Sequence, residues 1–249
     1  LSLHDALPIS ICEIPAPTFK EEARAGYYMD RLVAAGLDHV EMDSTGNVFG
    51  ILQGTGKGPK LLVAAHLDTV FPEGCDVTVI HKNGRYYAPG IGDNSKGLAA
   101  LLSVVRAFRD TRIKPIGDII FCGNVGEEGL GDLAGIKAFF RDNADVDGFI
   151  AVDGVGSKDI VYLATGSRRY EVTYRGPGGH SFSTFGVPSA IHAMGRAIAK
   201  IADVKTPRDP KTTFTVGTVS GGTSVNSIAA EAAMLIDMRS NATEELLKL

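Results

Sequence analysis

Residues 61–68 read LLVAAHLD, an apolar run that ends in a histidine and an aspartate. A short continuous apolar run of this kind is typical of a strand buried on both faces of a sheet. The same pattern recurs at residues 119–122, within IIFCGNVGEEG, and at residues 149–152, within GFIAVD. Each run is followed by acidic residues, so each of the three predicted strands ends beside carboxylate side chains.

Helical patterns separate the three apolar runs. Thr18 and Glu21 form a T-x-x-E capping box, so a first helix is expected to begin at Thr18 and to stop at Gly36. Further helices are expected over residues 95–108 and 133–140. Strands that alternate with helices predict an α/β fold with a mostly parallel sheet and right-handed crossovers.

The pattern changes after residue 165. There the sequence predicts strand, helix, two strands and helix, at residues 169–175, 188–202, 212–219, 232–238 and from 242 onward, with Asn241 as the last N-cap. This order is one strand short of a ferredoxin-like α+β unit. We therefore expect two domains, residues 11–165 and 166–249.

The two ends of the sequence also carry expectations. The chain starts at Leu1 without a methionine and stops at Leu249 in mid-helix without a C-cap, so both domains are expected to be incomplete at the C-terminus. The segment LSLHDALPIS at residues 1–10 fits poorly with the rest of the chain. We expect it to be foreign to the fold.

The composition argues against several classes of partner. The net charge of −4 and the lack of a basic stripe make nucleic acid an unexpected partner. No apolar run approaches the roughly 18 residues of a membrane span. The three scattered cysteines form neither a disulfide framework nor a thiolate metal site, and reduced cysteines of a cytoplasmic protein are the default expectation.

The acidic residues gather where binding sites form in α/β proteins, at the carboxyl ends of strands. These positions are His66 and Asp68 after the first run, Glu127 and Glu128 after the second, Asp153 after the third, and Asp93 in GIGDNSKG at a helix start. Carboxylates brought together raise one another's pKa and destabilise the site. A cation of charge two or more is the simplest compensation, so a hydrolytic metal centre is the leading hypothesis.

Each motif also has a second interpretation. The H-x-D pair is either a metal ligand with a supporting carboxylate or a loop histidine beside a helix-capping aspartate. The glycines of GIGDNSKG suggest phosphate binding, but the segment matches neither G-x-G-x-x-G nor a Walker motif, and Asp93 would repel phosphate. Glu127 and Glu128 point in opposite directions if extended, so one can bind metal while the other acts as a base, or both are solvated.

Together these motifs identify a resemblance. AAHLDTV, GIGDNSKG, GEEG, AVDG, RGPGGHS and IDMR occur in the order found in the co-catalytic zinc hydrolases, which include peptidase T, carboxypeptidase G, acetylornithine deacetylase and succinyl-diaminopimelate desuccinylase. The resemblance runs from about residue 11 to residue 249. It implies a zinc-hydrolase catalytic domain into which a lid domain is inserted.

The resemblance assigns roles to residues. His66 and Asp153 resemble the ligands of one zinc, Asp93 the carboxylate that bridges two metals, and Glu128 a ligand of the second. Glu127 resembles the general base and Asp68 the residue that orients His66. His180, in RGPGGHS, resembles a lid histidine that polarises the substrate carbonyl, and Asn226 a lid residue that contacts substrate. Without the resemblance, the RGPGGHS motif favours an ordinary loop histidine at position 180.

The resemblance also implies a cofactor, partners and a cis bond. Two divalent metal ions are expected, with zinc as the implied metal, and the peptide bond Asp93–Asn94 is expected to be cis. A homodimer through the lid is expected. The family's last zinc-binding histidine lies beyond the end of this chain, so one ligand is expected to be missing and the fragment to be inactive alone.

Three functions remain open at this level. The favoured one is hydrolysis of a small peptide by an aminopeptidase or di/tripeptidase, since Asp rather than Glu at position 153 is more typical of the family's peptidases. A deacylase of N-acyl amino acids is the alternative. A non-catalytic metal- or peptide-binding relative is the third, although such a protein has no need of the base Glu127.

Overall fold

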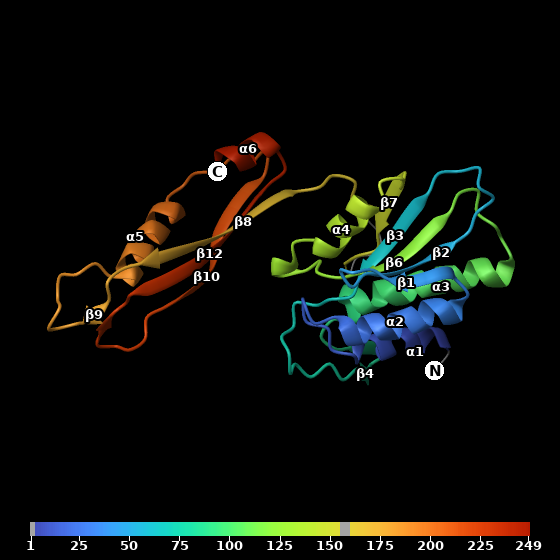
Figure 1. Ribbon diagram of the computed structural model, residues 1–249, viewed down its shortest axis with the longest axis horizontal. Coiled ribbons are helices and arrows are strands. Elements are labelled where there is room, and N and C mark those ends of the chain that lie inside the picture. Colours follow the sequence, from blue (N-terminus) through green and yellow to red (C-terminus); the bar gives the residue numbers. More distant parts are fainter. Residues whose placement is uncertain (1–2, 155–159) are drawn as a thin grey trace. The chain divides into compact units, whose positions relative to one another are not determined.

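The computed structural model describes residues 3–154 and 160–249 (Figure 1). The chain divides into two compact units, Leu1–Ser157 and Lys158–Leu249. Among the described residues, no helix has the length and apolar character needed to cross a bilayer.

The first unit is built on a five-stranded sheet in the order β1-β2-β6-β3-β7. Its strands are β1 (Asp38–Met42), β2 (Val48–Leu52), β3 (Leu61–His66), β6 (Ile119–Asn124) and β7 (Gly148–Ala151). β3 lies parallel to both β6 and β7, whereas β1 and β2 are antiparallel. The predicted α/β fold is confirmed, and the parallel part of the sheet is the part that carries the candidate site. The β1–β2 pair was not predicted.

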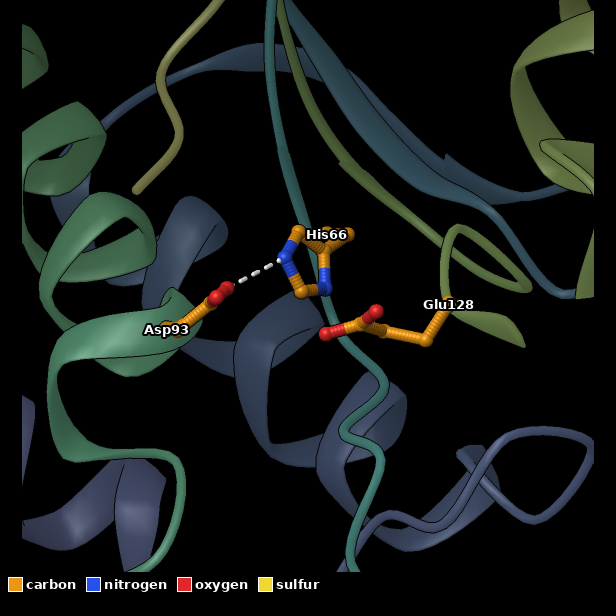
Figure 2. A group of neighbouring side chains, drawn as sticks. All are labelled: His66, Asp93 and Glu128. Carbon is orange, nitrogen blue, oxygen red and sulfur yellow. Dashed lines mark hydrogen bonds and ion pairs between the residues drawn. The ribbon is translucent and has the colours of Figure 1, made fainter. Parts of the chain in front are cut away.

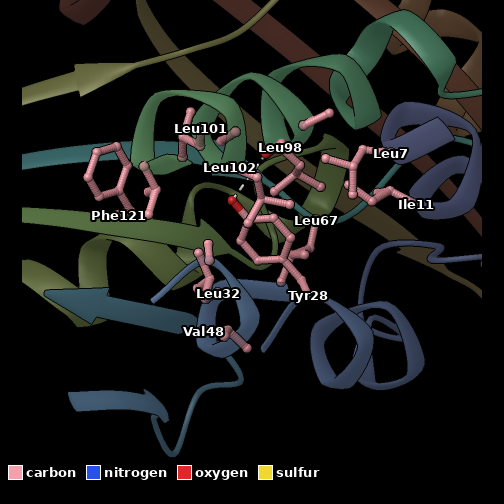
Figure 3. Close-up of a cluster of buried hydrophobic side chains, with 14 of the residues drawn as sticks. Leu7, Ile11, Tyr28, Leu32, Val48, Leu67, Leu98, Leu101, Leu102 and Phe121 are labelled. Carbon is pink, nitrogen blue, oxygen red and sulfur yellow. Dashed lines mark hydrogen bonds between the residues drawn. The ribbon is translucent and has the colours of Figure 1, made fainter. Parts of the chain in front are cut away.

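Helices cover both faces of this sheet (Figure 1). On one face lie α1 (Leu3–Cys12), α2 (Glu22–Ala35) and α3 (Lys96–Thr111), and on the other lies α4 (Ala134–Asp142). β3 alternates between the two cores, because Ala65 packs with the first helix group and Leu62 with the second. The larger core is shown in Figure 3, where the Tyr28 hydroxyl donates to the Leu98 carbonyl at 3.3 Å.

Short elements complete the first unit. A hairpin is formed by β4 (Ile80–Lys82) and β5 (Arg85–Tyr87), and single turns by η1 (Ile91–Ser95) and η2 (Gly129–Gly131). η1 leads directly into α3, so the GIGDNSKG motif forms the entry to that helix.

Two expectations about the N-terminal region are wrong. The helix predicted from Thr18 begins at Glu22, although its stop at Gly36 is confirmed by a positive φ of 92° there. The Thr18 hydroxyl donates to Asp68 instead of capping the helix. Residues 3–10 of the segment LSLHDALPIS are not separate from the fold, because they lie in α1 and the side chain of Leu7 is buried in the main core; residues 1 and 2 lie outside the described residues.

The second unit has a three-stranded antiparallel sheet in the order β10-β12-β8. Its elements are β8 (Gly166–Arg175), β9 (Gly179–His180), α5 (Ala190–Ala202), β10 (Thr212–Gly221), β11 (Ser227–Ile228), β12 (Glu231–Ser240) and α6 (Thr243–Lys248). α5 packs against the sheet through Ala190 and Met194. The predicted order is found, with the short β9–β11 pair added. The predicted cap Asn241 instead accepts a hydrogen bond from Thr165, and Ala242 precedes α6.

Candidate active site

The predicted site residues of the first unit lie at the carboxyl ends of its parallel strands. His66 is the last residue of β3, and Asp68 follows it by two positions. Glu127 and Glu128 follow β6, Asp153 follows β7, and Asp93 lies in η1. Because β3, β6 and β7 run in the same direction, their ends present these side chains at one edge of the sheet.

His66 lies at the centre of the group (Figure 2). Its Nε2 is 2.9 Å from Asp93 Oδ1 and 3.5 Å from Asp153 Oδ1. The His66 side chain is only 2% exposed, whereas the side chains of Asp93 and Asp153 are 49% and 44% exposed. The histidine therefore forms the floor of the site, and the two aspartates form its solvent-facing wall.

The donor set fits a divalent metal. Ligand atoms of His66, Asp93 and Glu128 all lie within 4.8 Å of one another. Figure 2 shows the side chains of Asp93 and Glu128 approaching the imidazole from opposite sides. Imidazole nitrogen together with carboxylate oxygens is a ligand set that suits zinc. The structure thus brings together all four residues predicted as metal ligands, with Asp153 beside the same ring nitrogen.

The charges of the site perturb the imidazole strongly. Burial by itself lowers the pKa of His66, but hydrogen bonding to Asp153 and Asp68 and their negative charge outweigh it and raise the pKa to about 11.

The two adjacent glutamates are partly buried and resist ionisation. Burial raises the pKa of Glu127, and the nearby charges of Asp153, Asp68 and Asp93 add to the effect. The pKa of Glu128 is also raised, by burial and by the charge of Glu127. Glu127 lines a cavity of about 110 Å³ together with His66 and Asp153. A glutamate with a raised pKa beside a cavity has the properties of a proton acceptor.

Asp68 binds the backbone that carries both glutamates. Its Oδ1 accepts the amide hydrogen of Glu127 at 3.0 Å, and its Oδ2 accepts that of Glu128 at 2.9 Å. Burial raises the pKa of Asp68, but hydrogen bonds from His66, Glu128 and Glu127 outweigh this effect and lower it. Asp68 is fully buried, and these contacts link the imidazole to the loop at residues 125–128, which carries Glu127 and Glu128 and is called the glutamate loop below.

Asn94 joins the segments that carry Asp93 and Asp153. Its Nδ2 donates to the Val152 carbonyl at 2.8 Å, and its Oδ1 accepts the Gly97 amide hydrogen at 3.1 Å. The Asp93–Asn94 peptide bond is cis, which confirms the prediction. Asn94 is buried and holds the two aspartate segments together.

His180 and Asn226 belong to the second unit and are described there alone. His180 Nδ1 accepts the amide hydrogens of Phe182 and Ser183 at 3.2 and 3.4 Å. Asn226 lies on the neighbouring segment, where its carbonyl accepts the Ser181 amide hydrogen at 2.9 Å. The pairing of β9 with β11 brings these two residues, 46 positions apart in the sequence, close together, and both are exposed.

Four residues beside the site were not assigned to it from the sequence: Thr18, Glu21, Asn47 and Asn94. Thr18 and Glu21 form a recognisable T-x-x-E pattern, but that pattern predicts a helix cap and not a contact with the site. Asn47 lies in the turn STGN, and Asn94 lies next to a predicted ligand. Neither asparagine carries a pattern that distinguishes a buried structural role from an ordinary loop position.

Comparison with known proteins identifies a family and several relatives of this chain. Residues 62–243 match the model of Peptidase family M20/M25/M40. The uncharacterized protein YqjE of Bacillus subtilis is 29% identical over 211 residues, which cover 81% of this chain and 54% of that protein. The chain thus spans about half the length of this relative.

Solved structures agree with the family match. A tripeptidase of Staphylococcus aureus superposes with a TM-score of 0.75 at 28% identity, covering 98% of this chain and 68% of that one. The aminopeptidase PepT of Bacillus cereus superposes with a TM-score of 0.71 at 26% identity, covering 98% and 69%. With its metal-ligand group and with most of its length matched, the chain belongs to Peptidase family M20/M25/M40, a family of metal-dependent hydrolases.

Proposed function

We propose that this chain carries the catalytic metal centre of an aminopeptidase or di/tripeptidase that hydrolyses an amide bond in a small peptide. The proposal rests on one observation, which is that two adjacent glutamates occupy different parts of the site. Glu128 groups with His66 and Asp93, whereas Glu127 lines the neighbouring cavity. The similarity to a tripeptidase and to an aminopeptidase supports a peptide substrate.

The ligand roles follow from these positions. We assign His66 and Asp153 to one divalent ion, Glu128 to a second, and Asp93 to both, with zinc as the metal. The metal ions, when bound, would lower the pKa of a water molecule and polarise the scissile carbonyl. Asp68 orients His66 and takes no proton, because its pKa lies below the ordinary value.

Proton transfer falls to Glu127 in this proposal. Its raised pKa keeps it close to the range in which a carboxylate accepts a proton and then releases it. It faces a cavity lined largely by apolar side chains, among them Ile136 and Phe149, where a proton transfer is shielded from bulk water. Glu127 therefore takes a proton from water and returns it to the leaving amine.

The second unit supplies the remaining groups. We propose that it acts as a lid, that Asn226 contacts the substrate, and that His180 stabilises the oxyanion that develops on the carbonyl. The exposure of both side chains supports this assignment, since each is available to a substrate. We also propose a homodimer through this unit.

A substrate panel tests the proposal. Di- and tripeptides are compared with N-acyl amino acids as substrates, with and without added Zn²⁺, for the 249-residue chain and for a longer protein that includes the rest of the family's catalytic domain. We expect zinc-dependent cleavage that favours peptides in the longer protein. Preference for N-acyl amino acids would identify a deacylase instead. Metal binding without turnover of any substrate would contradict a catalytic role.

A further inference from the structure

Four consecutive backbone amides in the loop after β6 each donate to a side chain from a distant segment. The loop is residues 125–128, which includes both catalytic-site glutamates. The acceptors are Asn47 Oδ1 for Val125 at 3.1 Å, Glu21 Oε1 for Gly126 at 3.1 Å, Asp68 Oδ1 for Glu127 at 3.0 Å and Asp68 Oδ2 for Glu128 at 2.9 Å. Side chains therefore replace the partners that a neighbouring strand would provide.

The loop needs such partners because of its shape and its burial. β6 ends at Asn124, and Gly126 has a φ of 61°, so the backbone turns away from the sheet. Val125 and Gly126 are buried, where an unpaired amide is costly. The side-chain oxygens satisfy these amides and at the same time set the direction of the backbone that carries Glu127 and Glu128.

Glu21 is the unexpected member of this group. It is 6% exposed and precedes α2, yet it makes no side-chain hydrogen bond to the first turn of that helix. Its Oε1 accepts the amide hydrogen of Phe19 at 3.0 Å as well as that of Gly126, 105 residues away. Burial raises the pKa of Glu21, although the hydrogen bonds from Phe19 and Gly126 act in the opposite direction.

Thr18 extends the arrangement from the same segment. Its hydroxyl donates to Asp68 Oδ2 at 3.0 Å, the oxygen that also accepts the Glu128 amide hydrogen. The residues that resembled a helix-capping box therefore face the glutamate loop instead. Both members of the T-x-x-E pattern reach the loop, one directly and the other through Asp68.

We propose that Glu21 is a positioning residue, which fixes the backbone from which Glu127 and Glu128 diverge by accepting the Gly126 amide hydrogen. The inference rests on the roles proposed above for those two glutamates. Without this bond the loop gains freedom at Gly126, and the two carboxylates no longer hold their separate directions. Metal binding through Glu128 and proton transfer by Glu127 then weaken together.

Three substitutions separate this role from simple packing. Glu21→Ala removes the acceptor. Glu21→Gln keeps an acceptor oxygen at the same reach without the charge. Glu21→Asp keeps the charge but is one methylene shorter, and it remains informative if the alanine variant does not fold. Glu22→Ala is the matched control, because Glu22 is the next residue and is exposed.

The first measurement is amide hydrogen exchange without metal or substrate, followed by NMR. In Glu21→Ala and Glu21→Asp, exchange at Gly126, Glu127 and Glu128 should accelerate about tenfold or more. Exchange at Phe121 and Cys122, in β6, should change only as global stability changes. Glu21→Gln and Glu22→Ala should resemble the wild type. The second measurement is Co²⁺ affinity, which should fall in Glu21→Ala and Glu21→Asp but not in Glu21→Gln or Glu22→Ala.

Two outcomes would overturn the proposal. One is unchanged exchange at residues 126–128 in Glu21→Asp, or an acceleration shared equally by the core of β6. The other is Glu21→Gln behaving like Glu21→Asp, since the role assigned to Glu21 needs only an acceptor. The exchange experiment involves no catalysis, so it can fail while the substrate panel succeeds, and the reverse.

Discussion

The Nδ1 of His66 lies 2.9 Å from the backbone carbonyl oxygen of Asp68, and the carboxylate of the same residue lies 3.5 Å from that nitrogen. A carbonyl only accepts hydrogen bonds, so Nδ1 carries a hydrogen and Nε2 is the atom that faces Asp93 and Asp153. One residue thereby decides which ring nitrogen is offered to a metal.

Asp68→Asn should damage this arrangement although it preserves size. Asp68 accepts from the amides of Glu127 and Glu128 with different oxygens, so an asparagine NH₂ group must face one of these donors. We expect the free energy of unfolding to fall by about 1–3 kcal/mol and Zn²⁺ affinity to fall about 10–100-fold. Urea unfolding and competition with a chelator measure the two effects. Asp76→Asn, at an exposed position, serves as the control, and equal losses there would contradict the role of Asp68.

Glu127→Gln and Glu128→Gln should differ in metal content. In an active, longer form of the protein, Glu127→Gln should abolish turnover and leave bound zinc nearly unchanged, because Glu127 lines the cavity and lies outside the ligand group. Glu128→Gln should lower zinc occupancy as well. Metal analysis after dialysis, together with peptide hydrolysis, distinguishes the variants. Equal zinc loss in both would show that the roles are wrongly divided.

Arg24→Lys should destabilise the first unit. The guanidinium is fully buried and donates to the carbonyls of Cys12, Ile14 and Leu67, and burial lowers its pKa to about 10. Lysine has a single nitrogen and cannot reach all three carbonyls, so we expect a loss of about 2–4 kcal/mol in the free energy of unfolding. Urea unfolding measures it. Arg141→Lys, where the side chain is 72% exposed, should change stability by less than about 0.5 kcal/mol.

Asp237→Asn should weaken the second unit in a pH-dependent way. Burial raises the pKa of Asp237, but hydrogen bonds from Arg169 and Arg239 outweigh it and lower the pKa below its unfolded value of about 3.9. The stabilisation is therefore complete above that value and is lost as pH falls through the lower folded pKa. We expect a cost of about 1 kcal/mol at pH 7, since the side chain is 30% exposed, and a progressively smaller cost as pH falls below about 3.9.

Chemical unfolding at several pH values tests this prediction. Glu231→Gln is the matched control, because its pair with Arg175 is exposed on both sides and should contribute little at any pH. A difference between wild type and Asp237→Asn that stays constant from pH 7 to pH 3 would contradict the assigned cause.

His180→Ala should keep metal and fold but lose most activity in an active homodimer. If His180 serves the partner's site, mixing this variant with Glu127→Gln should restore activity, because a hybrid dimer has one site with both residues. Peptide hydrolysis is measured after subunit exchange has been verified by mass spectrometry. If exchange occurs and activity does not return, His180 acts within its own chain or has no role.

The convergence of the candidate ligands was easier to predict from the sequence than the structure around them. The positions of the candidate ligands at strand ends were predictable, because an apolar run followed by a carboxylate marks both the strand and its end, as at Asp153. The β1–β2 pair was not, because β1 reads DHVEM and is exposed along most of its length, so no apolar periodicity marks it.

The capping box shows why local patterns fail near a site. Thr18 and Glu21 satisfy the T-x-x-E pattern, but their hydrogen bonds go to Asp68 and Gly126, which are 50 and 105 residues away. Tertiary partners compete with local ones for the same oxygen atoms, and the sequence pattern records only the local option. Asn47 was missed for a similar reason, since its side chain bonds the remote backbone of Val125 and Gly135 as well as the nearby Asp43.

The glutamate loop is consequently not a portable motif. Its four amides are bound by Asn47, Glu21 and Asp68, so the tetrapeptide 125–128 holds its conformation only where three remote segments meet it. Transplanting residues 125–128 (VGEE) alone into another α/β scaffold would transfer the carboxylates without their directions. A designer who wishes to reuse this centre has to carry over the acceptors as well, and a search for divergent relatives has to follow those acceptors along with the ligands.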